Sequence, residues 1–271
     1  MKERSKAGAV ISLLGAVIGI VGVFVVFMLA YEPMILVQMA VGRPDEATIV
    51  EYFIPFLSDI GIIAGALWAV AAYGFFQNER WAWTVAIIAN VISLLTGFFG
   101  MIPAMSKGQF PLFLVIFLPS LITYLLLLAY VRKVDAKIIT VSLLSGMTFV
   151  MAFMNGVAST DKIIINDNPL FVAVQRVNWV ASIGWGVFTV ALVTRKKWTL
   201  PVGLWAGLLT LTAGIPLAVA TTIEVGRFSM FSPAAILALV LLAVLFVPAG
   251  NRMLTQWLGD PASRGQVAAE D

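Results

Sequence analysis

Four polar side chains that are able to bind a ligand lie near the ends of long apolar segments of the sequence. At the edge of a membrane, the low dielectric constant strengthens interactions with a charged or zwitterionic molecule. We therefore take as candidate ligand-binding residues Asp59, Arg176, Asn178 and Glu224. The structural alternative is that these groups pair, extend to the surface or meet lipid headgroups without binding a ligand.

Side chains that the sequence lacks narrow the chemistry further. The 271 residues include no Cys and no His, so the chain offers no thiolate or imidazole to a zinc ion, a haem or an iron–sulfur cluster, and no His general base. The pair Asn166-Asp167 begins like the diphosphate-binding motif Asn-Asp-x-x-Asp of membrane prenyltransferases, but residue 170 is Leu170. That difference removes the second acid for Mg²⁺. We expect no catalytic residue, no metal ligand and no cofactor.

The composition requires membrane-spanning helices to position these residues. Hydrophobic residues make up 61% of the chain and charged residues 11%, whereas soluble domains have roughly 45–50% and about 25%. The apolar residues form runs long enough to cross ~30 Å of hydrocarbon as α-helix. We predict an all-α, polytopic transmembrane bundle of about eight spans, at 8–30, 57–77, 83–105, 110–131, 138–158, 171–194, 199–223 and 231–250.

Two segments are expected outside the bundle of spans. Within a membrane-embedded domain at 1–254, residues 32–56 connect the first two spans, and Pro44 followed by two acids predicts a helix start. Because four apolar residues between 49 and 54 share one helical face, we predict a short helix in the membrane interface, which covers the bundle or closes over a site. Residues 255–271 lose apolar periodicity and are predicted to form a loose cytoplasmic tail.

Basic residues are distributed unequally between the two sides of this predicted topology. The side of the N-terminus has 12 of the 17 Lys and Arg, namely Lys2, Arg4, Lys6, Arg80, Arg132, Lys133, Lys137, Arg195, Lys196, Lys197, Arg252 and Arg264. The other 5 are Arg43, Lys107, Lys162, Arg176 and Arg227. Because loops rich in Lys and Arg stay in the cytoplasm, we predict that both termini are cytoplasmic, in the plasma (inner) membrane. Short basic loops of this kind are topology signals, so no nucleic-acid partner is expected.

Two hairpins of predicted spans align with a constant offset of 117 residues. Trp68 aligns with Trp185, and Trp81 aligns with Trp198, although the chain has only 8 Trp. The turns that connect the two spans of each hairpin have the same length. The alternative to a repeat is a pair of independent hairpins with Trp at a cytoplasmic turn, where this residue is common.

A repeat of this kind predicts a duplicated chain with parallel halves at 1–134 and 135–254, because each half has an even number of spans. Asp59 and Arg176 take equivalent positions in the two halves. We predict that they approach one another or lie at matching places around the pseudo-axis.

Uncharged polar residues lie deeper in the predicted spans. Asn90 and Ser93 share one face of the third span, and Ser120 and Thr123 share one face of the fourth. Such side chains usually form hydrogen bonds between helices. The alternative is that they line a path for a substrate.

For function, the absence of charge from the middle of the spans favours a non-catalytic accessory or scaffold subunit, since coupled transport of ions or protons usually needs a buried carboxylate. The alternative is a small permease for a neutral, zwitterionic or lipid-like substrate, with a path between the two helical halves. An enzyme ranks third. The expected partners are the lipid bilayer and other membrane subunits.

Overall fold

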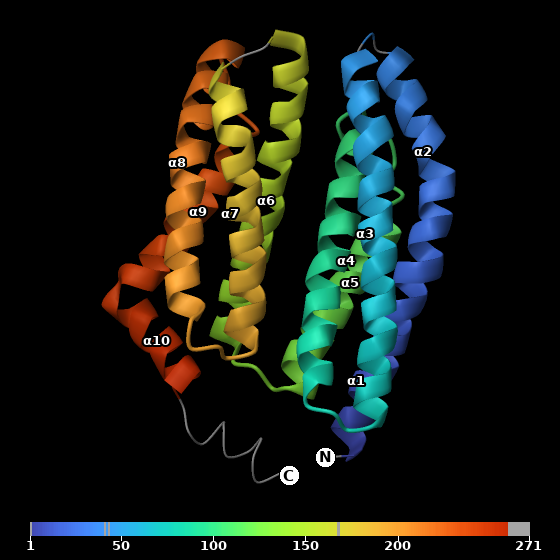
Figure 1. Cartoon of the computed structure of the whole chain (residues 1–271), viewed down its shortest axis with the longest axis vertical. Helices are drawn as coiled ribbons and strands as arrows, with labels where there is room; N and C mark the ends of the chain where they lie inside the picture. The colour runs from blue at the N-terminus through green and yellow to red at the C-terminus, as the bar shows by residue number, and fades with distance from the viewer. Residues whose placement is uncertain (1, 41, 43, 167–168, 260–271) are drawn as a thin grey trace. The chain divides into compact units, whose positions relative to one another are not determined.

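The computed structural model describes residues 2–40, 42, 44–166 and 169–259 (Figure 1). Every regular element in these ranges is helical, so the predicted all-α class is confirmed. Within the described residues, seven continuous helical runs are long and apolar enough to cross a membrane, or up to 8 when two helices joined at a sharp bend count as one span. The chain is therefore a polytopic helical membrane protein.

The chain forms two compact units. Among the described residues, the N-terminal unit comprises those within 2–133 together with 164–166, and the C-terminal unit comprises 134–163 and 169–259. Compactness alone says nothing of a common origin, so the duplicated halves at 1–134 and 135–254 stay a prediction.

The N-terminal unit begins with one long helical run. Its elements are α1 (Lys2–Val17), the π-helical turn η1 (Ile18–Gly22), α2 (Val23–Ala40), α3 (Pro44–Phe76), α4 (Trp81–Met105), α5 (Leu114–Leu126) and the π-helical turn η2 (Leu127–Val131). Gly42 allows the tight turn between α2 and α3, because its φ of 73° lies in the left-handed region that glycine adopts without strain. Pro44 then begins α3 at a position where a helix needs no N–H donor.

The prediction of a short, separate interfacial helix within 32–56 is wrong. The first helical run continues to Ala40, and α3 runs without a break from Pro44 to Phe76. Buried residues follow one another at helical spacing in α2 (Val26, Ala30, Met34) and in the first half of α3 (Ala47, Val50, Ile54). Because α2 and α3 pack against each other, the apolar face that we assigned to the membrane surface is buried inside the unit.

The C-terminal unit contains the remaining helices. They are α6 (Ala136–Asn166, of which residues 164–166 count with the N-terminal unit), α7 (Pro169–Val193), α8 (Thr199–Val225), α9 (Ser232–Phe246) and α10 (Pro248–Gly259). The axes of α9 and α10 differ by 76°. Val247 is extended, with φ −65° and ψ 132°, as expected for a residue that precedes a proline, and Pro248 begins the next helix.

The loose tail predicted from 255 onward needs a correction. Residues 255–259 are the last part of α10, and the rest of the predicted tail, 260–271, lies outside the described residues. Leu254 and Leu258 are buried, whereas Thr255 and Gln256 are exposed. The segment therefore has helical periodicity with one apolar face, but the face is narrow and the sequence around it is polar.

The turns between α3 and α4 and between α7 and α8 have the same backbone hydrogen bonds. In the first turn, the N–H of residue 77 donates to the carbonyl of 73, that of 78 to 75 and that of 79 to 74. In the second turn, the N–H of residue 194 donates to the carbonyl of 190, that of 195 to 192 and that of 196 to 191. Asn78 and Arg195 both have left-handed backbones, with φ of 60° and 56°. Every member of the second set is offset by 117 residues from its equivalent in the first.

One tryptophan in each unit is fully buried and hydrogen-bonded. The Nε1 of Trp68 donates to the Oγ of Ser93 at 3.2 Å, and the Nε1 of Trp185 donates to the Oγ1 of Thr210 at 2.9 Å. Because an indole N–H needs an acceptor when buried, each hydroxyl ties the first helix of its hairpin to the second. Both bonds join residues that are 25 apart in the sequence.

Candidate functional site

The four residues predicted to bind a ligand lie on three helices. Asp59 is on α3 of the N-terminal unit, Arg176 and Asn178 are on α7, and Glu224 is near the end of α8. Within the C-terminal unit, the interactions of Asn178 and Glu224 are made with residues outside the predicted set.

Asp59 and Arg176 are exposed side chains at equivalent places on their own helices. Each lies 17 residues before the end of its helix, Phe76 in α3 and Val193 in α7, which is about 26 Å at 1.5 Å per residue. Neither has a hydrogen-bond or ion-pair partner among the described residues. This distance puts both charges close to one edge of ~30 Å of hydrocarbon, where a charged side chain can reach the headgroups.

Asn178 is fully buried, with 0% of its surface exposed. Its Nδ2 donates to the carbonyl oxygen of Val174, one turn earlier in α7, at 3.0 Å. Its Oδ1 is buried and accepts no hydrogen bond. The side chain is therefore enclosed within the C-terminal unit, with one unsatisfied acceptor.

Glu224 forms an ion pair with Lys162 at the end of α6. The Oε1 of Glu224 lies 2.9 Å from the Nζ of Lys162, and the two side chains are 49% and 27% exposed. Pairs this exposed usually contribute between 0 and about 1 kcal/mol to stability. The pair links α6 to α8 and agrees with the structural alternative for this residue.

Two buried polar side chains of α4 donate to neighbouring helices in the N-terminal unit. The Nδ2 of Asn90 in α4 donates to the carbonyl oxygen of Ser120 at 3.1 Å and to the Oγ1 of Thr123 at 2.9 Å, both in α5. The Oγ1 of Thr96 donates to the carbonyl oxygen of Leu57 in α3 at 3.1 Å. These bonds fix α4 between two other helices.

The C-terminal unit has similar bonds at different positions. The hydroxyls of Ser145 in α6 and Thr189 in α7 are 2.8 Å apart, and the Oγ of Ser182 donates to the carbonyl oxygen of Phe149 at 2.9 Å. The Nδ2 of Asn155 donates to the carbonyl oxygen of Phe231 at 3.1 Å. Inter-helix bonding of this kind is what the sequence predicted for its deeper polar residues.

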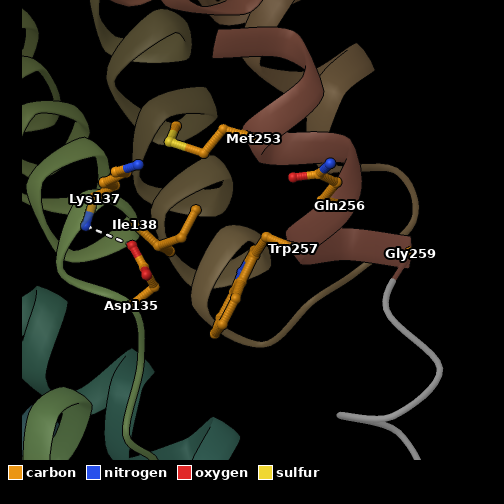
Figure 2. A pocket seen from close by; sticks show the side chains of 7 residues that line it. All are labelled: Asp135, Lys137, Ile138, Met253, Gln256, Trp257 and Gly259. Carbon is orange, nitrogen blue, oxygen red and sulfur yellow. Dashed lines mark hydrogen bonds between the residues drawn. The ribbon is translucent and has the colours of Figure 1, made fainter. Parts of the chain in front are cut away.

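An open groove of about 600 Å³ lies between the start of α6 and α10 (Figure 2). One side is formed by residues at the start of α6 and the other by α10, and the lining consists of Asp135, Lys137, Ile138, Met253, Gln256, Trp257 and Gly259. Sequence reasoning missed this groove, because it assigned residues 255–259, the last part of α10, to a loose tail. The amphipathic spacing of Met253, Leu254, Trp257 and Leu258 was the signal available.

Trp257 is held firmly at one wall of the groove. Its Nε1 donates to the carbonyl oxygen of Leu192 in α7 at 2.8 Å. The guanidinium carbon of Arg195 lies 3.6 Å from the centre of the indole ring, a cation–π contact. At the opposite wall, the carboxylate of Asp135 accepts a 2.8 Å hydrogen bond from the backbone N–H of Lys137 and so caps α6.

No family model, no curated protein and no solved structure matches this chain. Among the residues that the structure describes, no group of three or more acidic side chains is arranged to hold a metal ion. Of the Asn166-Asp167 pair, Asp167 and the side chain of Asn166 lie outside the described residues.

Proposed function

We propose that this chain is a non-catalytic accessory or scaffold subunit of a membrane-protein assembly. The observation that carries the proposal is that every buried polar side chain in the described ranges is uncharged, and most of them bond to a neighbouring helix or to their own. Transport coupled to ions or protons usually needs a buried ionisable group. Outward-facing charges such as Asp59 and Arg176 suit contacts with lipid headgroups and with another subunit.

A permease is the second candidate, for a neutral, zwitterionic or lipid-like substrate with a path between the two halves. The observation in its favour is a set of buried amide oxygens without donors, on Asn90, Asn155 and Asn178. A neutral substrate with N–H or O–H groups would satisfy such acceptors. A substrate of that kind needs no buried charge.

The proposed setting is the plasma (inner) membrane, with both termini in the cytoplasm. The matched turns between α3 and α4 and between α7 and α8 contain Arg80 and the run from Arg195 to Lys197. The positive-inside rule assigns such turns to the cytoplasm.

We also propose that the two hairpins descend from one duplicated segment. Support comes from two independent features, the backbone hydrogen bonds of the turns and the buried Trp–hydroxyl pairs, which repeat at the same offset of 117 residues. An even number of spans in each half would make the repeats parallel.

The test of the accessory role is an assembly measurement on the full chain at its native expression level. Blue native electrophoresis of gently solubilised membranes should find the chain in a particle much larger than 29.2 kDa. Deletion of its gene should change the migration of the complex that contains its partner subunits. Asp59→Asn and Arg176→Gln should release the chain and leave its thermal stability unchanged, because both side chains are exposed.

Glu79→Gln is the matched control, since Glu79 is an exposed acid in the turn after α3. A chain that migrates alone, together with flux of a neutral solute through the purified protein in liposomes, would favour the permease instead. Loss of thermal stability in the two charge variants would mean that they are structural residues.

A further inference from the structure

The groove between α6 and α10 has walls of two different kinds. Met253 and Trp257 supply apolar surface, and the indole N–H of Trp257 is already bonded to the carbonyl oxygen of Leu192. Lys137 and Gln256 are exposed and supply polar donors at the same opening. A volume of about 600 Å³ lies within the range of small-ligand sites. A groove with both apolar and polar walls can bind an amphiphilic molecule, which has an apolar and a polar part.

Lys137 is the charged group of the groove that is free to bind. Its ammonium group has no partner among the described residues, and Figure 2 shows its side chain extending along the groove toward Met253. The carboxylate of Asp135 is engaged by the backbone N–H of Lys137. An incoming anion would therefore meet an unpaired ammonium beside a carboxylate that is already hydrogen-bonded.

The surroundings of the groove are basic. Arg195 contacts Trp257, and Arg252 lies on α10, with its Nε bonded to the carbonyl oxygen of Pro248. Lys196 and Lys197 follow Arg195 in the turn before α8. Asp135 is the one acidic residue at this end of the unit in the described part of the chain. The positive charge around the groove favours the binding of an anion.

α10 directly follows the apolar helix α9. It turns by 76° from α9, and its apolar residues Leu254 and Leu258 are buried on the unit while its polar residues are exposed. Basic segments that adjoin a membrane-spanning helix attract anionic headgroups. In the proposed membrane setting, the groove beside α10 lies next to the end of α9, where an anionic headgroup is available.

We propose that this groove binds the headgroup of an anionic phospholipid. The ammonium of Lys137 pairs with the phosphate, Gln256 donates to the headgroup, and Met253 and Trp257 contact the glycerol and the first part of the acyl chains. The site rests on the membrane setting proposed above and is independent of the accessory role.

The test uses the full chain, purified and delipidated in detergent, with binding of phosphatidylglycerol and phosphatidylcholine measured by native mass spectrometry. Wild type should retain phosphatidylglycerol in preference to phosphatidylcholine. Lys137→Gln should weaken phosphatidylglycerol binding about fivefold, the effect of one basic residue near an anionic surface. Lys6→Gln, an exposed lysine of the N-terminal unit, should leave it unchanged.

Three results would overturn the proposal. Equal retention of the two lipids would remove the preference for a negative headgroup. An equal loss in Lys6→Gln and Lys137→Gln would show a general charge effect without a site. Displacement of the lipid by millimolar inorganic phosphate would show that the groove recognises free phosphate. Because Lys137 is exposed, its replacement is not expected to prevent folding, and an unchanged melting temperature checks this.

Discussion

Gly19 and Gly65 bring the first helical run into backbone contact with α3. A Cβ atom added to Gly19 would lie 2.5 Å from the Cα of Gly65, and one added to Gly65 would lie 2.7 Å from the carbonyl carbon of Gly19. No side chain fits between the two helices at this point. Small residues allow such approaches in membranes, where packing drives helix association.

Gly19→Ala and Gly65→Ala should therefore each destabilise the protein by about 1–3 kcal/mol, the usual cost of overpacking. Both changes would lower the melting temperature in detergent, as followed by intrinsic tryptophan fluorescence. Gly146→Ala is the control, because nothing lies within 4 Å of its added Cβ. Equal melting temperatures in all three variants would contradict the close contact.

Trp68→Phe and Trp185→Phe should have similar effects, since each change keeps an aromatic ring and removes one buried hydrogen bond. We expect a loss of about 1 kcal/mol in each. Trp81→Phe and Trp198→Phe form a control pair with the same offset, but these side chains are 39% and 47% exposed and should change stability little. The free energy of unfolding can be measured by SDS titration in mixed micelles. A large effect in one unit only would weaken the proposed duplication.

The orientation can be read from single cysteines, because the native chain has none. Gln109→Cys and Glu79→Cys lie just outside opposite ends of α4, and both positions are exposed. An impermeant maleimide should label Gln109→Cys in intact cells and Glu79→Cys only after permeabilisation. The reverse pattern would place both termini outside the cytoplasm.

Glu224→Gln should lower stability by less than about 1 kcal/mol, because the ion pair with Lys162 is substantially exposed. The exchanged double variant, Lys162→Glu with Glu224→Lys, should recover the wild-type melting temperature. If Glu224→Gln kept its stability but failed to complement a deletion of the gene, the residue would return to the set of candidate ligand-binding residues.

The sequence predicted the helical class and the spans because long apolar runs are incompatible with other folds. It failed where packing decides the outcome. The first span was predicted to end at residue 30, yet α2 continues through Glu32 and Pro33, with Met34 and Gln38 buried beyond them. The partner that stabilises this extension is the early part of α3, and a contact between distant segments is not visible in either one alone.

The candidate site shows the same limit. The sequence identified Asp59, Arg176 and Glu224 by charge, but charge does not reveal whether a side chain faces outward or already has a partner. Glu224 has Lys162, 62 residues away in the sequence. The groove beside α10 was missed because its walls come from residues 135–138 and 253–259, which only the folded C-terminal unit brings together.

The short length of α9 affects the membrane around it. Its 15 residues extend over about 22 Å, roughly 8 Å less than the hydrocarbon thickness of an average bilayer. α3, with 33 residues, is about 50 Å long and exceeds that thickness. Thinning of the bilayer where α9 meets lipid would relieve this hydrophobic mismatch, as would association with another helix. In the first case, lipids with shorter acyl chains should collect at this edge of the C-terminal unit.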